Sequence, residues 1–279
     1  MRAIPQPLWQ IRLIGPQDTV FDAAEALGFL EGMEALSLSV FEVKPGRFRL
    51  EAGYATESEA REVAARLGAE VERVEARDWV SEVQKNLAPV AAGRFVLFGA
   101  HDRGTVTGEV PIEVEAGPAF GSGHHPTTRG CLELFSDLLD EGLATRRVLD
   151  LGCGTGVLAI AAALTTEAEI VASDIDEDAV QVTEETAARN GARLNTFRAD
   201  GMDDPRLQGP FDLVFANILA GPLIGLAPDV EKATAEGGLV ILSGLLEEQA
   251  PDVLAAYQGL EEVRRTVIDG WAALLLRKA

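Results

Sequence analysis

The stretch VLDLGCGTGVL, residues 148–158, decides the fold of this chain. An apolar strand runs into a loop that contains Gly152, Gly154 and Gly156, and a helix follows directly. Glycines let a backbone turn sharply and approach a ligand closely, and the helix N-terminus behind them presents unpaired N–H groups. The stretch therefore predicts a ligand-binding turn between a strand and a helix, although an ordinary tight turn would look the same in isolation.

The acidic residues around this loop indicate the kind of ligand. The spacing G-x-G-x-G departs from the G-x-G-x-x-G of dinucleotide-binding enzymes, and Asp150 ends the strand. Asp174 ends the next strand, 22 residues after Gly152, where a carboxylate can accept hydrogen bonds from both ribose hydroxyls. NAD enzymes bind the ribose in the same way, so this aspartate does not separate the two kinds of ligand. Asp176 is the competing choice for the ribose contact, unless Asp176 or Asp178 instead begins the following helix as its N-cap. We expect a nucleoside ligand without a pyrophosphate, of which S-adenosylmethionine is the commonest.

Strands and helices alternate from about residue 147 to the end of the chain. Such alternation predicts a mainly parallel sheet with helices on both faces. The last two strands, 262–268 and 271–277, are separated only by Asp269-Gly270, which indicates a hairpin. A final antiparallel hairpin fits the sheet of class I methyltransferases better than a dinucleotide-binding sheet. We predict an α/β fold with a doubly wound, mainly parallel seven-stranded sheet over residues 94–279.

The N-terminal third predicts a separate α+β domain. Residues 1–77 read in the order βαββαβ, which is that of a ferredoxin-like fold. Thr56, followed three residues later by Glu59, has the capping-box pattern of a helix start. Residues 78–93 are expected to form a linker helix between the two domains.

Composition restricts the environment and the partners. The chain has 279 residues, 47% of them hydrophobic, and no apolar run of the ~18 residues that a membrane span needs. Its N-terminus lacks the apolar core of a signal peptide, and Cys131 and Cys153 alone form no disulfide framework, so we expect a cytoplasmic protein. A net charge of −21 without a basic cluster disfavours nucleic acid. It suits a basic, lysine-bearing protein partner, although acidity can also serve solubility alone.

Two further polar residues end predicted strands of the large sheet. Asn217 follows the apolar strand of FDLVFAN, residues 211–217, at the crevice where open α/β sheets bind ligands. Its amide can orient an amine nucleophile, or it can merely pair with a turn of the backbone. Asp200 ends the third strand, where it could meet an adenine amino group or remain a solvated loop residue.

The loop AGPAFGSGHHPTT, residues 116–128, is rich in glycine, histidine and threonine. So many special residues in one loop indicate a segment next to a site. A metal site is disfavoured because no Cys/His cluster has ligand spacing. A hydrolase using Ser122 is also disfavoured because G-x-S-x-G is missing from its strand–turn–helix context.

These segments together resemble a known family. AFGSGHHPTT, DLGCGTGVLAIAA, NILAGPL and GGLVILSGLL are similar to methyltransferases that modify the eleventh protein of the large ribosomal subunit, most clearly over residues 112–246. The resemblance implies a protein N-methyltransferase that moves methyl groups from S-adenosylmethionine to lysine and N-terminal amines. It also implies that the N-terminal domain recognises the ribosomal protein.

The resemblance assigns roles residue by residue. Thr128 ends the H-P-T-T element and should help to bind the cofactor, as should Phe120 and Gly121 in the same loop. Gly152, Gly154 and Gly156, with Asp150, would form the cofactor loop. Asp174 would hold the ribose, and Asn217 would face both the cofactor and the incoming amine as the catalytic residue. Asp200 is expected near the adenine from its place at a strand end alone.

Three other functions remain open from the sequence. An RNA or small-molecule methyltransferase has the same fold, although the acidity of the chain speaks against RNA. A non-catalytic scaffold could bind a ribosomal protein and keep a residual cofactor site, although the intact glycines, Asp174 and Asn217 argue against such decay. A nicotinamide oxidoreductase is disfavoured by the loop spacing and the final hairpin.

Overall fold

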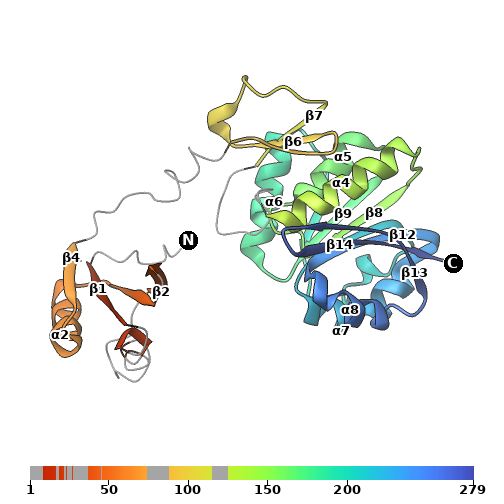
Figure 1. Ribbon diagram of the computed structural model, residues 1–279. Helices are drawn as coiled ribbons and strands as arrows, with labels where there is room; N and C mark the ends of the chain where they lie inside the picture. The colour runs from red at the N-terminus through yellow and green to blue at the C-terminus, as the bar shows by residue number, and fades with distance from the viewer. Residues whose placement is uncertain are drawn as a thin grey trace. The chain divides into compact units, whose positions relative to one another are not determined.

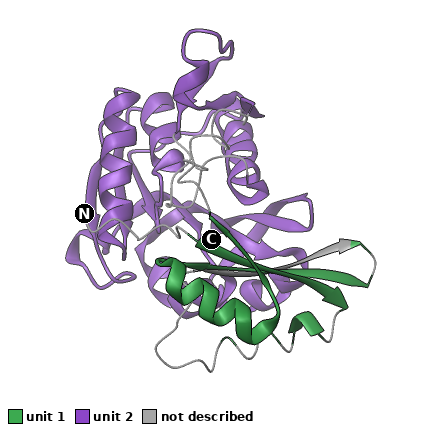
Figure 2. Ribbon diagram, turned by 90° about the vertical axis from the view of Figure 1, so that its left-hand side faces the viewer, with its two compact units in different colours: residues 1–82 green, residues 83–279 purple. Residues whose placement is uncertain are grey.

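A computed structural model describes residues 9–16, 19–21, 23, 27, 37–44, 46–73, 88–114 and 125–279. The chain divides into two compact units, residues 1–82 and 83–279, which Figure 2 draws in green and purple. Within the described residues, no helix is both long enough and apolar enough to span a membrane.

The first unit is built on a four-stranded antiparallel sheet. Its strands lie in the order β2 (Ser37–Lys44), β3 (Arg47–Tyr54), β1 (Trp9–Pro16) and β4 (Glu70–Arg73). Helix α2 (Glu57–Leu67) packs on this sheet, because its buried alanines and valine belong to the same apolar cluster as the inner side chains of β1 and β3.

Local chemistry fixes the ends of α2. The capping box predicted from the sequence is confirmed: the Thr56 hydroxyl oxygen accepts from the Glu59 N–H at 3.3 Å, and the Glu59 carboxylate accepts from the Thr56 N–H at 3.2 Å. Gly68 ends the helix in a left-handed conformation with φ of 64°, which only glycine adopts at little cost.

A three-stranded sheet opens the second unit. It consists of β5 (Val90–Ala92), β6 (Phe95–Phe98) and β7 (Val110–Glu113), with a short 3₁₀ turn, η1 (Ala100–Asp102), between the last two strands. Of the segment expected to be a linker helix, residues 78–87 lie outside the described residues, and residues 90–92 form strand β5.

A seven-stranded mixed sheet is the centre of the second unit (Figure 1). Its strands are β8 (Arg147–Leu151), β9 (Glu169–Asp174), β10 (Asn195–Arg198), β11 (Phe211–Asn217), β12 (Thr234–Leu246), β13 (Leu260–Ile268) and β14 (Trp271–Lys278). They lie in the order β10-β9-β8-β11-β12-β14-β13. The pairs from β10 to β12 are parallel, and β14 is antiparallel to both of its neighbours. The predicted α/β fold is therefore correct, with a mixed central sheet.

Helices cover both faces of this sheet (Figure 1). They are α4 (Pro126–Asp140), α5 (Val157–Thr165), α6 (Glu177–Arg189), α7 (Ala220–Ala233) and α8 (Ala250–Ala256), with short 3₁₀ turns η2 (Pro205–Leu207) and η3 (Glu247–Gln249). One buried apolar cluster joins α4 and α5 to the sheet, and a second joins α7 and α8 to it. The sheet is thus buried on both sides, as its nearly continuous apolar strands require.

The predicted hairpin at the end of the chain is also confirmed. Asp269 and Gly270 both have positive φ, 50° and 79°, as a two-residue hairpin turn needs. Because β14 is antiparallel, its first residue lies at the edge of the sheet where the parallel strands end. We call this edge the carboxyl edge.

Candidate functional site

A cavity of about 840 Å³ lies along the carboxyl edge, in the upper part of the ~300–1,000 Å³ range typical of ligand pockets. Residues lining it follow the order of the strands across the sheet: Ala199 and Asp200 after β10, Asp174 of β9, Gly152 and Gly154 after β8, Asn217 of β11, Gly244 of β12 and Trp271 of β14. Open α/β sheets bind their ligands at this edge.

The glycine loop forms the floor of the cavity between β8 and α5. Gly152, Gly154 and Gly156 have φ values of 73°, 56° and 77°, so all three need a conformation that other residues avoid. A Cβ on Gly152 would lie 2.4 Å from Cγ2 of Ile218. Gly152 and Gly154 line the cavity, whereas Gly156 packs against the Thr183 side chain and begins α5.

Asp174 ties the glycine loop to the end of β9. Its carboxylate accepts from the Gly154 N–H and from the Asp176 N–H, each at 3.0 Å. Asp176 caps α6, because its carboxylate accepts from the Asp178 N–H. Asp176 therefore has the N-cap role considered for it, and it lines the cavity together with Asp174. The assignment of the ribose to Asp174 stays a prediction.

Asp150 lies beneath the loop rather than on the cavity wall. It is 1% exposed, and its carboxylate accepts from the Ala159 N–H at 3.0 Å. Burial raises its pKa to about 7, against the lowering effect of the Ala159 hydrogen bond, and the charge of Asp174 raises it further. Asp150 thus joins β8 to α5 and supports the loop from below.

The end of the cavity next to β10 carries two polar groups. Asp200 is exposed and lines the cavity, and its contact with an adenine stays a prediction. Ser173 also lines it, and among the described residues its buried hydroxyl oxygen has no hydrogen-bond partner. A buried polar atom without a partner is costly, so a ligand that hydrogen-bonds to Ser173 would remove this cost.

Asn217, which lines the cavity, contacts Thr128 behind it, although 89 positions separate them in the sequence. The Asn217 Nδ2 donates to the Thr128 hydroxyl oxygen at 3.3 Å. Thr128 is fully buried on α4, so this bond fixes which way the amide faces. The Asn217 Oδ1 is buried and has no partner among the described residues; it is an acceptor available to a ligand N–H group.

Two residues near Asn217 escaped the analysis of the sequence. Trp271 begins β14 and lines the cavity together with His125, the N-cap of α4. Gly244 of β12, with φ of 87°, lies against the backbone of Ile218, the residue after Asn217. The only signals for them were the position of the tryptophan after the Asp-Gly turn and the third glycine of GGLVILSGLL.

Part of the predicted loop site lies outside the described residues. Phe120 and Gly121 belong to this part, and the described chain resumes at His125. Among the described residues, no group of three or more acidic, histidine or cysteine side chains is placed to hold a metal ion.

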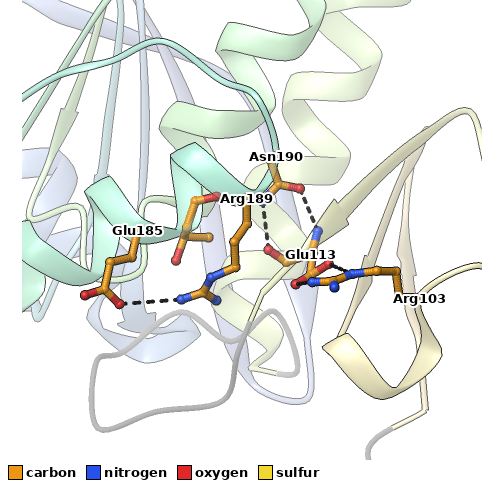
Figure 3. A network of polar contacts seen from close by, with 6 residues as sticks. Arg103, Glu113, Glu185, Arg189 and Asn190 are labelled. Atoms are coloured by element: carbon orange, nitrogen blue, oxygen red, sulfur yellow. Dashed lines mark hydrogen bonds and ion pairs between the residues drawn. The ribbon is translucent and has the colours of Figure 1, made fainter.

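A polar network away from the cavity holds β7 in place (Figure 3). Asn190, which follows α6, accepts from the Glu113 N–H and donates to the Glu113 carbonyl oxygen, both at 2.8 Å. The buried Glu113 carboxylate accepts from Arg103, with one of the two contacts at 2.7 Å. Glu113 comes one residue before the end of the described segment that precedes the loop, so this network fixes where the chain leaves the small sheet.

Fold and site together define a class of protein. A mixed sheet with a final antiparallel hairpin, a G-x-G-x-G loop after β8 and an aspartate at the end of β9 are the features of a class I methyltransferase that uses S-adenosylmethionine. The chain belongs to the family described as ribosomal protein L11 methyltransferase (PrmA), whose model matches residues 47–279.

Individual relatives agree with this family. The ribosomal protein L11 methyltransferase of Bradyrhizobium diazoefficiens is 51% identical over 212 residues, which are 74% of this chain and 72% of the relative. That of Brucella melitensis biotype 2 is 42% identical over 258 residues, 88% and 90% of the two chains. Among solved structures, a ribosomal protein L11 methylase from Lactobacillus delbrueckii subsp. bulgaricus aligns with a TM-score of 0.61 at 26% identity, covering 69% of this chain and 100% of that one.

Proposed function

We propose that this protein transfers methyl groups from S-adenosylmethionine to lysine and N-terminal amines of ribosomal protein L11. The observation that carries the proposal is the fixed amide of Asn217, whose Nδ2 is bound to Thr128 and whose Oδ1 is left without a partner at the cavity. An acceptor held in this way suits a nucleophile that carries N–H groups. The names of the relatives supply the substrate, a large-subunit ribosomal protein.

The side of the cavity next to β8, β9 and β10 suits the cofactor. Asp174 offers carboxylate oxygens for a ribose, Gly152 lines the cavity without a side chain, and Asp200 lines the end next to β10, where we place the adenine. The unpartnered hydroxyl of Ser173 fits a polar ligand at the same place. When bound, the cofactor supplies an electrophilic methyl group on a positively charged sulfur.

The residues of the protein would prepare the amine for attack. A lysine with a pKa near 10.4 costs roughly 4–5 kcal/mol to deprotonate at pH 7, whereas an α-amine near 7.7–8 costs about 1 kcal/mol. Burial favours the neutral amine, and Ile218 and Leu219, which follow Asn217, are apolar residues that line the cavity. Phe215, also expected at this wall, lies in the core against Phe135 instead. After the proton leaves to water, Asn217 Oδ1 accepts from a remaining N–H and directs the lone pair toward the methyl carbon. With the methyl donor bound, the N–C bond would form as the C–S bond breaks, and the bonding electron pair would stay on sulfur.

The N-terminal residues are proposed to recognise the substrate. We assign residues 1–77 to a ferredoxin-like recognition domain, 78–93 to a linker whose last residues form β5 and pair with β6, and 94–279 to the methyltransferase domain. The strand order β2-β3-β1-β4 with α2 on the sheet supports the first assignment. The net charge of −21 favours a basic, lysine-bearing protein over nucleic acid. We also propose a cytoplasmic location, in keeping with a ribosomal protein substrate.

Methyl transfer to purified components tests the proposal. The protein is incubated with labelled S-adenosylmethionine, L11 and ribosomal RNA, and label is expected on L11. Asn217→Ala should lower kcat roughly 100-fold, the scale expected when a reacting group loses its alignment, and should change cofactor affinity much less. Asn195→Ala, at the exposed start of β10, is the matched control and should keep full activity. Label on RNA alone, or tight cofactor binding with no label on L11, would contradict the proposed function.

A further inference from the structure

Two aromatic rings form a corner in the wall of the cavity. The ring centroids of His125 and Trp271 lie 4.7 Å apart, and their planes make an angle of 71°. Both side chains line the same cavity as Asn217. We call this pair the aromatic corner.

The hairpin holds the tryptophan of the corner in place. Trp271 directly follows the Asp269-Gly270 turn and pairs with Leu246 of β12. The Glu247 N–H donates to the Gly270 carbonyl oxygen at 2.9 Å, which joins the turn to the end of β12. Trp271 is therefore held in place both by its pairing with β12 and by the hydrogen bond of the turn that precedes it.

The first turn of α4 holds the histidine. The Thr127 N–H and the Thr127 hydroxyl both lie within hydrogen-bond distance of His125 Nδ1, at 3.3 and 2.8 Å. Since Nδ1 accepts, the ring proton belongs on Nε2. Partial burial lowers the pKa of His125, which favours the uncharged ring and reduces its repulsion of a cation.

The position of the corner assigns it to the amine rather than to the cofactor. The residues suited to a nucleoside belong to β8, β9 and β10, whereas Asn217, His125 and Trp271 lie on the other side of β8, in β11, α4 and β14. This step rests on the proposed function, because it takes the nucleoside to be the cofactor and the remaining space to be that of the substrate.

We propose that the aromatic corner binds the target nitrogen in its cationic forms, both the incoming ammonium and the methylated ammonium product, through cation–π attraction. Asn217 Oδ1 holds a nitrogen only through an N–H, and each transferred methyl removes one. An aromatic face attracts a cation without needing an N–H. The aromatic corner therefore still binds the nitrogen as methyl groups accumulate. Trp271, as part of this corner, determines specificity for ammonium groups.

A pair of small probes tests the proposal on the wild-type enzyme loaded with S-adenosylhomocysteine. Choline carries a trimethylammonium group, and 3,3-dimethylbutan-1-ol has the same shape without the charge. Calorimetry should show choline binding at least roughly fivefold more tightly, which corresponds to about 1 kcal/mol of cation–π attraction. Equal affinity for the two probes would overturn the proposal.

Two substitutions of Trp271 then locate the effect. Trp271→Phe keeps an aromatic face, and Trp271→Leu keeps an apolar side chain without one. The preference for choline should persist in Trp271→Phe and disappear in Trp271→Leu, while both variants keep their affinity for S-adenosylhomocysteine. A preference retained in Trp271→Leu would remove Trp271 from the site. If Trp271→Leu does not fold, the comparison of the two probes on wild-type enzyme still decides whether an ammonium site exists.

These measurements are independent of L11. An enzyme that prefers choline but leaves L11 unlabelled would keep the aromatic corner and reject the proposed substrate. Labelling of L11 by an enzyme that does not prefer choline would support the proposed substrate and reject the aromatic corner.

Discussion

Replacing Gly244 by alanine should disturb the turn that carries Asn217. A Cβ at this position would lie 2.2 Å from the carbonyl oxygen of Ile218 and 2.6 Å from its carbonyl carbon. Both atoms are backbone, so no side chain can rotate away. The φ of 87° at Gly244 adds a cost of roughly 1–2 kcal/mol for any residue with a Cβ.

The size of the losses in stability and activity depends on whether the turn that carries Asn217 moves. If it stays in place, overpacking of roughly 1–3 kcal/mol adds to the cost of φ, so the free energy of unfolding falls by about 2–5 kcal/mol. If the turn moves by the roughly 1 Å that an ordinary contact needs, stability falls less. Asn217 is then displaced, and a displacement of this size lowers kcat about 100-fold.

Urea unfolding and steady-state methyl transfer, measured on the same preparation, separate these outcomes. Gly237→Ala is the matched control, because Gly237 is also in β12, has φ of 73°, and has nothing within 4 Å of an added Cβ. The free energy of unfolding of Gly237→Ala should fall by only about 1–2 kcal/mol, the cost of a positive φ for a residue with a Cβ, and the variant should keep its activity. A Gly244→Ala enzyme as stable and as active as Gly237→Ala would refute the close contact as the reason for the glycine.

Two further predictions concern groups that support the site. Asn190→Ala removes both hydrogen bonds to the Glu113 main chain and should lower the free energy of unfolding by roughly 1–3 kcal/mol. Asn195→Ala should stay within about 0.5 kcal/mol of wild type, and equal values for the two variants would contradict the prediction. The pKa of Asp150 is raised to about 7 by burial, so its contribution to stability is complete below pH 4 and is lost as the pH rises through 7, by up to about 4 kcal/mol. Unfolding of Asp150→Asn, measured from pH 4 to 8, should lack this loss, and parallel curves for the variant and wild type would show that Asp150 does not titrate in this way.

The sequence predicted those parts of the molecule that short stretches of chain determine. The capping box at Thr56, the Asp269-Gly270 turn and the alternation of strands and helices after residue 147 all depend on residues a few positions apart. The carboxyl edge followed from the same alternation, because parallel strands end on one side. Asp174 and Asn217 were predicted at this edge for that reason, and both line the cavity.

The remaining features of the site depend on contacts between distant segments. Trp271 meets His125 only because the last strand lies antiparallel beside β12. Gly244 is close to Ile218 because β11 and β12 are neighbours in the sheet, with Asn217 paired to Ser243. Asp150 looked like a cofactor ligand from its place after the strand, but its side chain points under the loop to the Ala159 N–H. No local pattern distinguishes a side chain above a loop from one below it.

The antiparallel direction of β14 has a consequence for the chemistry of the site. In a fully parallel sheet, each strand would bring its last residue to the carboxyl edge, and the residue after a helix would lie at the far edge. Here the strand beside β12 brings its first residue, Trp271, to the cavity. Trp271 pairs with Leu246 of β12, and the Glu247 N–H donates to the Gly270 carbonyl oxygen just before it, so both contacts hold the tryptophan at the cavity. The reversed strand thus supplies a rigid aromatic wall on the side of the cavity away from the glycine loop, where an amine would meet Asn217.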